Sequence, residues 1–152
     1  MKKLFSILLI VVCLFLTGCG SKSKVAVSLD NFDTVLTDSD FTVDDNMITY
    51  SDVDYITGAR IAKYNNISIE MVSYSDNEHA KMVQDKQIQN FGLRKSTGAH
   101  EKTEKGDNFY KYFLVSNNRY MISTRVDNTL IFCQTLLENK DTVDKVLEKL
   151  GY

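Results

Sequence analysis

The stretch that decides the fold is Phe109–Leu136, with the sequence FYKYFLVSNNRYMISTRVDNTLIFCQTL. Its runs of β-branched and aromatic residues predict strands over 109–115, 120–126 and 129–136. Asn117-Asn118 and Asp127-Asn128 separate these runs, and such pairs tolerate the positive φ angles of tight turns. Strands joined this closely must be antiparallel neighbours, so we expect a three-stranded meander.

A second hairpin is predicted upstream, over residues 56–64 and 67–74, with Asn65-Asn66 as its turn. Ile67, Ile69 and Met71 alternate with polar residues and are expected to share the buried face. Earlier still, Phe41 and Val43 alternate with polar neighbours in an extended segment.

Apolar residues at helical spacing predict three helices. The first follows Ser28, a good N-cap, and places Leu29, Phe32 and Leu36 on one face. The second is predicted to open with a capping box, Ser75 and Glu78, and to end before a C-terminal cap at Gly92. The third carries a stripe of Val143, Val146, Leu147 and Leu150.

The predicted order is therefore α-β-β-α-β-β-β-α, which places the chain in the α+β class. We expect a single domain with an antiparallel sheet of about five strands and helices packed on one face. Strands grouped between helices argue against a parallel nucleotide-binding sheet. With 43% hydrophobic residues, 25% charged residues and a net charge of −2, the composition excludes wholesale disorder and gives no nucleic-acid-binding signature.

The N-terminus reads as a secretion signal, with Lys2 and Lys3 before an apolar run from Leu4 to Leu16. As a helix this run would reach only ~20 Å, which is short of the roughly 30 Å hydrocarbon core of a bilayer. The following tetrad Leu16-Thr17-Gly18-Cys19 resembles the lipobox of bacterial lipoproteins.

This resemblance implies that residues 1–18 are a signal peptide, that Cys19 is lipidated, and that the protein is anchored on the extracytoplasmic face of the cell membrane. Residues 19–24 would then be the lipidated cysteine and a short tether, and 25–152 the domain. The whole chain is similar to short lipoproteins of low-GC Gram-positive bacteria, and its element order resembles Mog1/PsbP-like α+β domains. Neither resemblance implies any site residue beyond Cys19.

An acidic segment follows the tether: between Val25 and Ala59 there are eight aspartates and no Glu, Lys or Arg. Carboxylates are the oxygen ligands that Ca²⁺ prefers, but the spacing does not match the calcium-binding loop of EF-hands. Calcium binding therefore stays an alternative to an ordinary role in caps, turns and solvated loops. The candidate ligands are Asp38, Asp40, Asp44, Asp45, Asp52 and Asp54.

Candidate catalytic residues are few. Neither His79 nor His100 has a Cys or His at zinc-ligand spacing, and no nucleophile or metalloprotease motif is present. Cys13 leaves with the leader and Cys19 is lipidated, so Cys133 stands alone in an apolar run and is expected to be buried. We expect no catalysis, no cofactor and no metal site. An enzyme would need a pocket that gathers His79, His100 or Cys133 with a carboxylate.

Two further features leave alternatives open. The polar stretch 93–108 is predicted to be a long loop, either functional or mobile. Tyr110, Tyr112 and Tyr120 lie on predicted strands, where they suit either an interface or ordinary cross-strand packing.

The resulting hypothesis is a lipid-anchored, non-catalytic binding module. Its expected contacts are the membrane, through Cys19, and another envelope or secreted protein. A surface protein that binds a small ligand or Ca²⁺ is the alternative. The sequence specifies neither the ligand nor the oligomeric state.

Overall fold

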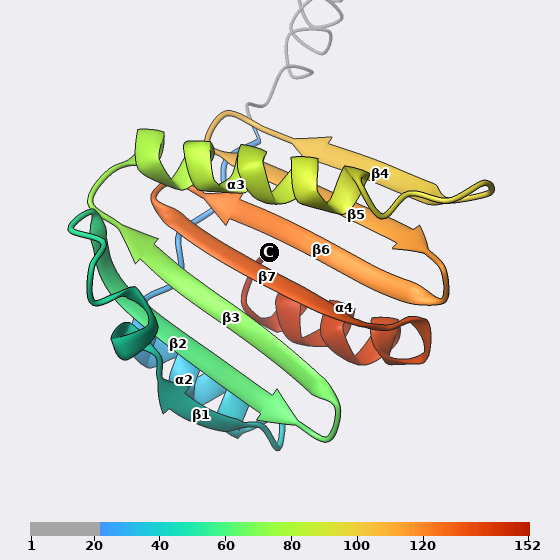
Figure 1. The fold of residues 1–152 in the computed structure, drawn as a ribbon. Coiled ribbons are helices and arrows are strands. Elements are labelled where there is room, and N and C mark those ends of the chain that lie inside the picture. Colours follow the sequence, from blue (N-terminus) through green and yellow to red (C-terminus); the bar gives the residue numbers. More distant parts are fainter. Residues whose placement is uncertain (1–21) are drawn as a thin grey trace, which may run out of the picture.

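The computed structural model describes residues 22–152, which build one antiparallel sheet and the helices that cover it (Figure 1). In chain order the elements are α2 (Leu29–Thr37), β1 (Thr42–Asp45), the short 3₁₀ helix η1 (Met47–Tyr50), β2 (Ile56–Tyr64), β3 (Ile67–Tyr74), α3 (Asn77–Gly92), β4 (His100–Lys105), β5 (Phe109–Ser116), β6 (Arg119–Val126), β7 (Thr129–Leu136), the 3₁₀ helix η2 (Leu137–Asn139) and α4 (Lys140–Lys149). The leader, Cys19 and the first part of the predicted tether lie outside the described residues.

The predicted hairpins are confirmed. The sheet order is β1-β2-β3-β7-β6-β5-β4, so the meander of β5, β6 and β7 joins the β2–β3 hairpin through β3 and β7. The turn residues have the expected positive φ angles, 50° at Asn65, 52° at Asn117, 57° at Asn118 and 47° at Asp127. The α+β class is likewise confirmed.

The predicted number of strands is wrong: within residues 22–152 the sheet has seven strands, not about five. The two additional strands, β1 and β4, form the two edges of the sheet. β4 falls in the stretch 93–108, which we predicted to be a loop. Its sequence HEKTEK has every residue exposed, so no buried face leaves a hydrophobic pattern in the sequence.

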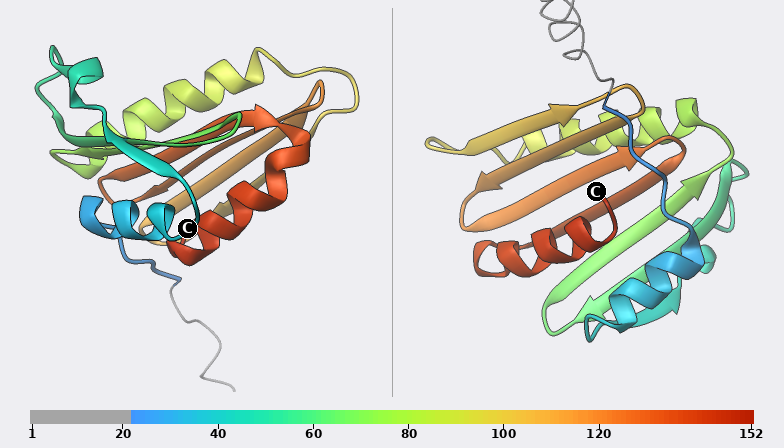
Figure 2. Two further views of the ribbon diagram at one scale, coloured as in Figure 1. Left: turned by 90° about the horizontal axis from the view of Figure 1, so that it is seen from below. Right: turned by 180° about the vertical axis from the view of Figure 1, so that it is seen from behind.

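The prediction that the helices pack on one face is also wrong. α2 and α4 cover one face of the sheet, and α3 lies on the opposite face (Figure 2). The central strands explain this arrangement, because neighbouring residues that point to opposite faces are both fully buried. Examples are Leu130 and Ile131 on β7. Two apolar faces require helices on both sides.

The helix ends agree with the prediction in part. Ser28 caps α2, its Oγ accepting from Asn31 N at 3.2 Å. α3, however, is capped by Asp76, whose Oδ1 accepts from His79 N at 2.9 Å, and not by Ser75. Gly92 is the last residue of α3 and has no positive φ, so the predicted left-handed cap there is wrong.

A buried glutamine fastens α3 to the sheet. Gln84 is 1% exposed, and its Nε2 donates to Tyr110 O at 3.0 Å and to Ser123 O at 3.4 Å. Its Oε1 accepts from Arg125 Nε at 3.2 Å. One side chain therefore joins the helix to both β5 and β6.

Candidate functional site

A groove runs along α3 on the face of the sheet opposite α2 and α4. α3 forms one wall, the segment 46–55 that contains η1 forms the other, and β3 and β7 supply the floor. Two hollows of about 340 and 360 Å³ make up the groove, and they share Gln87 and Phe132. We call this feature the α3 groove.

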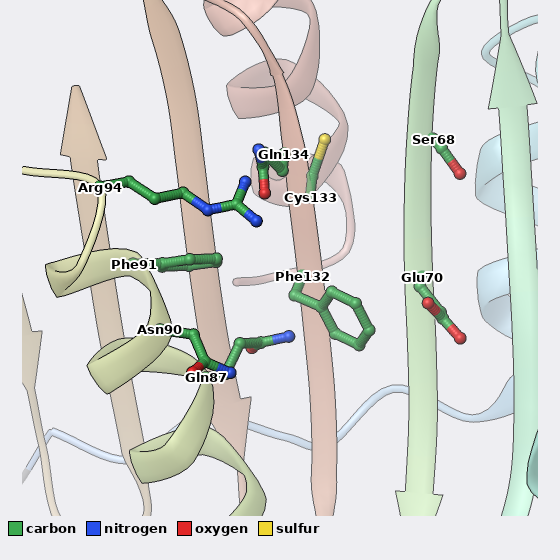
Figure 3. Close-up of a pocket in the computed structure, with 9 residues that line it drawn as sticks. All are labelled: Ser68, Glu70, Gln87, Asn90, Phe91, Arg94, Phe132, Cys133 and Gln134. Atoms are coloured by element: carbon green, nitrogen blue, oxygen red, sulfur yellow. The ribbon is translucent and has the colours of Figure 1, made fainter. Parts of the chain in front are cut away.

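The first hollow combines an apolar floor with polar walls. Phe132 lies between β7 and β3 and points in the direction of Glu70, while Gln87, Asn90 and Arg94 enter from the α3 side (Figure 3). The Oε1 atom of Gln87 is buried and has no hydrogen-bond partner among the described residues. A buried acceptor without a partner is costly, so a donor from a ligand would be stabilised there.

Glu70 links the floor of the groove to the η1 wall. Its Oε1 accepts hydrogen bonds from Tyr50 Oη at 2.5 Å and from Asn46 Nδ2 at 2.6 Å. Burial, and then the hydrogen bond to Glu70, raise the pKa of Tyr50 well above its usual range, so this hydroxyl stays protonated and donates. The network holds the η1 segment in place over the sheet.

The second hollow is more aromatic. Tyr50, Tyr55, Tyr74 and Phe132 line it, together with Val83 and Met82 of α3. Tyr55 stacks with His79, at 4.4 Å between ring centroids, and with Tyr74, at 6.3 Å. The hollow therefore offers flat apolar surfaces with polar edges, which suits the side chains of a peptide.

Charged side chains line the α3 side and the floor of the groove. Lys86 and Arg94 line it on the α3 side. Glu70 lies on the floor, where its carboxylate accepts the hydrogen bonds from Tyr50 and Asn46. The groove therefore fits a partner with both charged and apolar groups better than a purely apolar one.

The aspartates predicted as calcium ligands do not converge. Among residues 22–152, no group of three or more His, Cys, Asp or Glu side chains is placed to hold a metal ion. Asp44 pairs with Lys63 at 3.4 Å, and Asp45 pairs with Arg60 at 2.9 Å while its other oxygen accepts from Met47 N. These side chains stabilise the β1 edge and the turn that follows it.

The residues required for the enzyme alternative are not brought together. His79 is at the start of α3, where its Nδ1 lies 2.7 Å from Asp76 Oδ2, and His100 opens β4 at the sheet edge. Cys133 is on β7, three strand positions from β4, a separation of ~14 Å. Its side chain packs in the core on the α2 and α4 face, where burial raises the pKa of the thiol to about 12.

Two of the three candidate interface tyrosines pack in the core. Tyr112 and Tyr120 are 6% and 1% exposed, and their hydroxyls donate to Glu101 at 2.7 Å and to Asp144 at 2.6 Å. Tyr110 is half-buried and packs beside Tyr112. The packing alternative is thus the correct one for this region.

The end of the predicted tether is attached to the domain. Lys22 O accepts from Asp107 N at 3.0 Å. Lys24 N and O make two hydrogen bonds to the side chain of Asn108, at 2.9 and 2.8 Å. Residues 22 and 24 are therefore held against the turn between β4 and β5, and Cys19 lies outside the described residues.

The residues of the α3 groove were not predicted from the sequence. One signal was present, since Glu70 lies on the face opposite Ile69 and Met71 and shares that face with the apolar residues Val72 and Tyr74. A carboxylate on a half-buried sheet face needs partners, and Tyr50 and Asn46 supply them. Gln87 and Phe132 gave no comparable signal, because each fits an ordinary helix or strand pattern.

Comparison with known proteins gives a similarity in structure but none in sequence. No protein-family model matches the chain, and no curated protein matches its sequence. Among solved structures, a GTP binding regulator from Thermotoga maritima is similar over 83% of this chain and 86% of that chain, with 20% identity and a TM-score of 0.48. Within the described part of the chain, no helix has both the length and the apolar character that crossing a membrane requires.

Proposed function

We propose that the protein is a lipid-anchored, non-catalytic binding module of the cell envelope, attached to the extracytoplasmic face of the membrane through Cys19. The lipobox Leu16-Thr17-Gly18-Cys19 supports the anchor. The observation that supports a binding role is the α3 groove, an open site with a buried acceptor on Gln87 that has no partner among the described residues.

The partner is a segment of another envelope or secreted protein. Between Met82 and Phe91 the groove follows α3 for ~14 Å, at 1.5 Å per helical residue, which is the length of about four residues of extended peptide. Its aromatic hollow accepts apolar side chains, and Lys86 and Arg94 on the α3 side favour a segment that also carries an acidic side chain. Met82, which is 52% exposed, supplies an adaptable apolar contact on the rim.

Site-specific photo-cross-linking in cells, with the full-length lipidated protein, tests this function. The photo-reactive residue replaces Met82 in the groove or, as a matched control, Lys145, which is exposed on α4 at the opposite face. We expect one dominant envelope protein to be cross-linked from position 82 only, and the adduct to disappear in Cys19→Ala. Equal adducts from both positions, or none from position 82, would contradict the proposed groove function.

A further inference from the structure

The described chain begins at one particular edge of the sheet. Lys22 and Lys24 are bound to the turn between β4 and β5, and β4 is an edge strand (Figures 1 and 2). Gly106 permits this contact, because a Cβ atom there would lie 2.1 Å from Lys22 O. The point at which the chain leaves the domain is thus fixed by several hydrogen bonds.

Covalent geometry then limits the distance to the anchor. Cys19 is three residues before Lys22, and three residues span at most ~11 Å. An acylated Cys19 therefore holds the β4–β5 turn close to the bilayer surface. The other edge strand, β1, lies six strand spacings away, or ~29 Å.

Charge is segregated along the same direction. Seven basic and three acidic residues lie in residues 22–24 and 93–116, the part of the chain that includes the docked tether, β4 and β5. Residues 25–59, which include α2, β1 and η1, contain eight aspartates and no basic residue. The acidic edge is more than three Debye lengths, of about 8 Å each, from the anchored edge at physiological salt, so its repulsion by an anionic surface is screened.

At the anchored edge, both glutamates of β4 are paired with lysines, and other basic side chains have no carboxylate partner among the described residues. Glu101 and Glu104 are already paired with Lys95 and Lys102, each at 2.6 Å. Lys105 has no carboxylate partner among the described residues, and the amino group of Lys24 lies 5.0 Å from the Phe109 ring centroid. Asp107 is the acidic residue of the turn itself.

We infer that the β4 edge, with Lys22, Lys24 and Lys105, is a surface that contacts the anionic headgroups of the phospholipid bilayer and orients the domain. The acidic β1 edge then points away from the membrane. The α3 groove, whose floor is formed by the inner strands β3 and β7, is left open to envelope proteins. This orientation rests on the proposed lipidation of Cys19, and it explains why the exposed edge strand β4 carries lysines.

Two matched labelling sites test the orientation. Thr103 on β4 and Thr42 on β1 are both exposed threonines on edge strands, and each is changed to Cys in the full-length lipidated protein. Cys133 is buried, so it does not compete for the fluorescent label. The labelled proteins are reconstituted in vesicles of phosphatidylglycerol and phosphatidylcholine that contain a lipid with a nitroxide headgroup, which quenches fluorescence at short range.

We expect most of the fluorescence at position 103 to be quenched and that at position 42 to be unaffected. Lys105→Glu should weaken the quenching at 103, whereas Lys145→Glu on α4 should not. Three results would overturn the inference. They are equal quenching at both sites, stronger quenching at position 42, and quenching at position 103 that is unchanged in vesicles of pure phosphatidylcholine. Failure of the protein to float with the vesicles would instead refute the lipid anchor, and with it the proposed function.

Discussion

Gln84 should be one of the most important polar side chains for stability. It is the point at which α3 is bonded to β5 and β6, and its three hydrogen bonds are all at 3.0–3.4 Å inside the protein. Each such bond contributes ~1 kcal/mol net, and removing a partner leaves buried groups unsatisfied. Gln84→Ala should therefore lower the free energy of unfolding by ~3 kcal/mol, a large part of the 5–15 kcal/mol typical of a domain.

Gln87 provides the control for this prediction, because it lies one turn further along the same helix. Its side chain faces the α3 groove, and its Oε1 has no partner among the described residues. Gln87→Ala should not lower the free energy of unfolding appreciably, because it breaks no buried hydrogen bond and removes an acceptor that has no partner among the described residues.

Urea unfolding of the chain from Lys22 onward, followed by circular dichroism, compares the two variants. The midpoint should fall clearly for Gln84→Ala and barely for Gln87→Ala, at an unchanged slope. A loss below ~1 kcal/mol for Gln84→Ala, or equal losses for the two variants, would show that the glutamine is not what fixes α3 to the sheet.

Three further predictions concern individual side chains. Tyr120→Phe removes the 2.6 Å hydrogen bond to Asp144 and should cost ~2 kcal/mol in urea unfolding, whereas Tyr110→Phe should cost little; equal losses would contradict a specific role of this bond. The backbone hydrogen bond from His79 lowers the pKa of Asp76 to about 2, so its capping contribution is fully present above about pH 4 and is lost as pH falls through about 2. The stability difference between the native protein and Asp76→Ala should accordingly shrink over that range in acid titrations, and a constant difference would exclude the cap. Burial raises the pKa of Cys133 to about 12, so a thiol reagent should label it only after denaturant is added; rapid labelling of the folded protein would show that the core on the α2 and α4 face opens.

Much of the fold could be predicted because its signals are local. The turns at Asn65, Asn117 and Asp127 and the stripe on α4 follow from neighbouring residues alone. The face of the sheet on which α3 packs cannot be predicted from neighbouring residues alone. It depends on the burial of both faces of β6 and β7, which a run such as Met121-Ile122 indicates only once its strand is known to be central.

The candidate site was less predictable, because it is built from residues far apart in the chain. Tyr50 and Glu70 are brought together by the fold of segment 46–55 over β3, and Gln87 enters from α3. No spacing in the sequence encodes such a convergence. The proposed anchor is the opposite case, since the tetrad Leu16-Thr17-Gly18-Cys19, which resembles a lipobox, is continuous in the sequence.

Edge strand β4 was hidden from the sequence, and β1 showed only the short alternation of Phe41 and Val43, for the same reason that makes both strands suited to function. An edge strand must avoid pairing with other chains, so β1 and β4 carry polar and charged residues in place of an apolar pattern. Because packing does not dictate those residues, their charge is free to serve another role. Here one edge is acidic and the other is richer in lysine, and the tether is docked on the second. If Cys19 is anchored as proposed, this distribution would hold the α3 groove at a defined orientation to the membrane, without any additional contact with a partner.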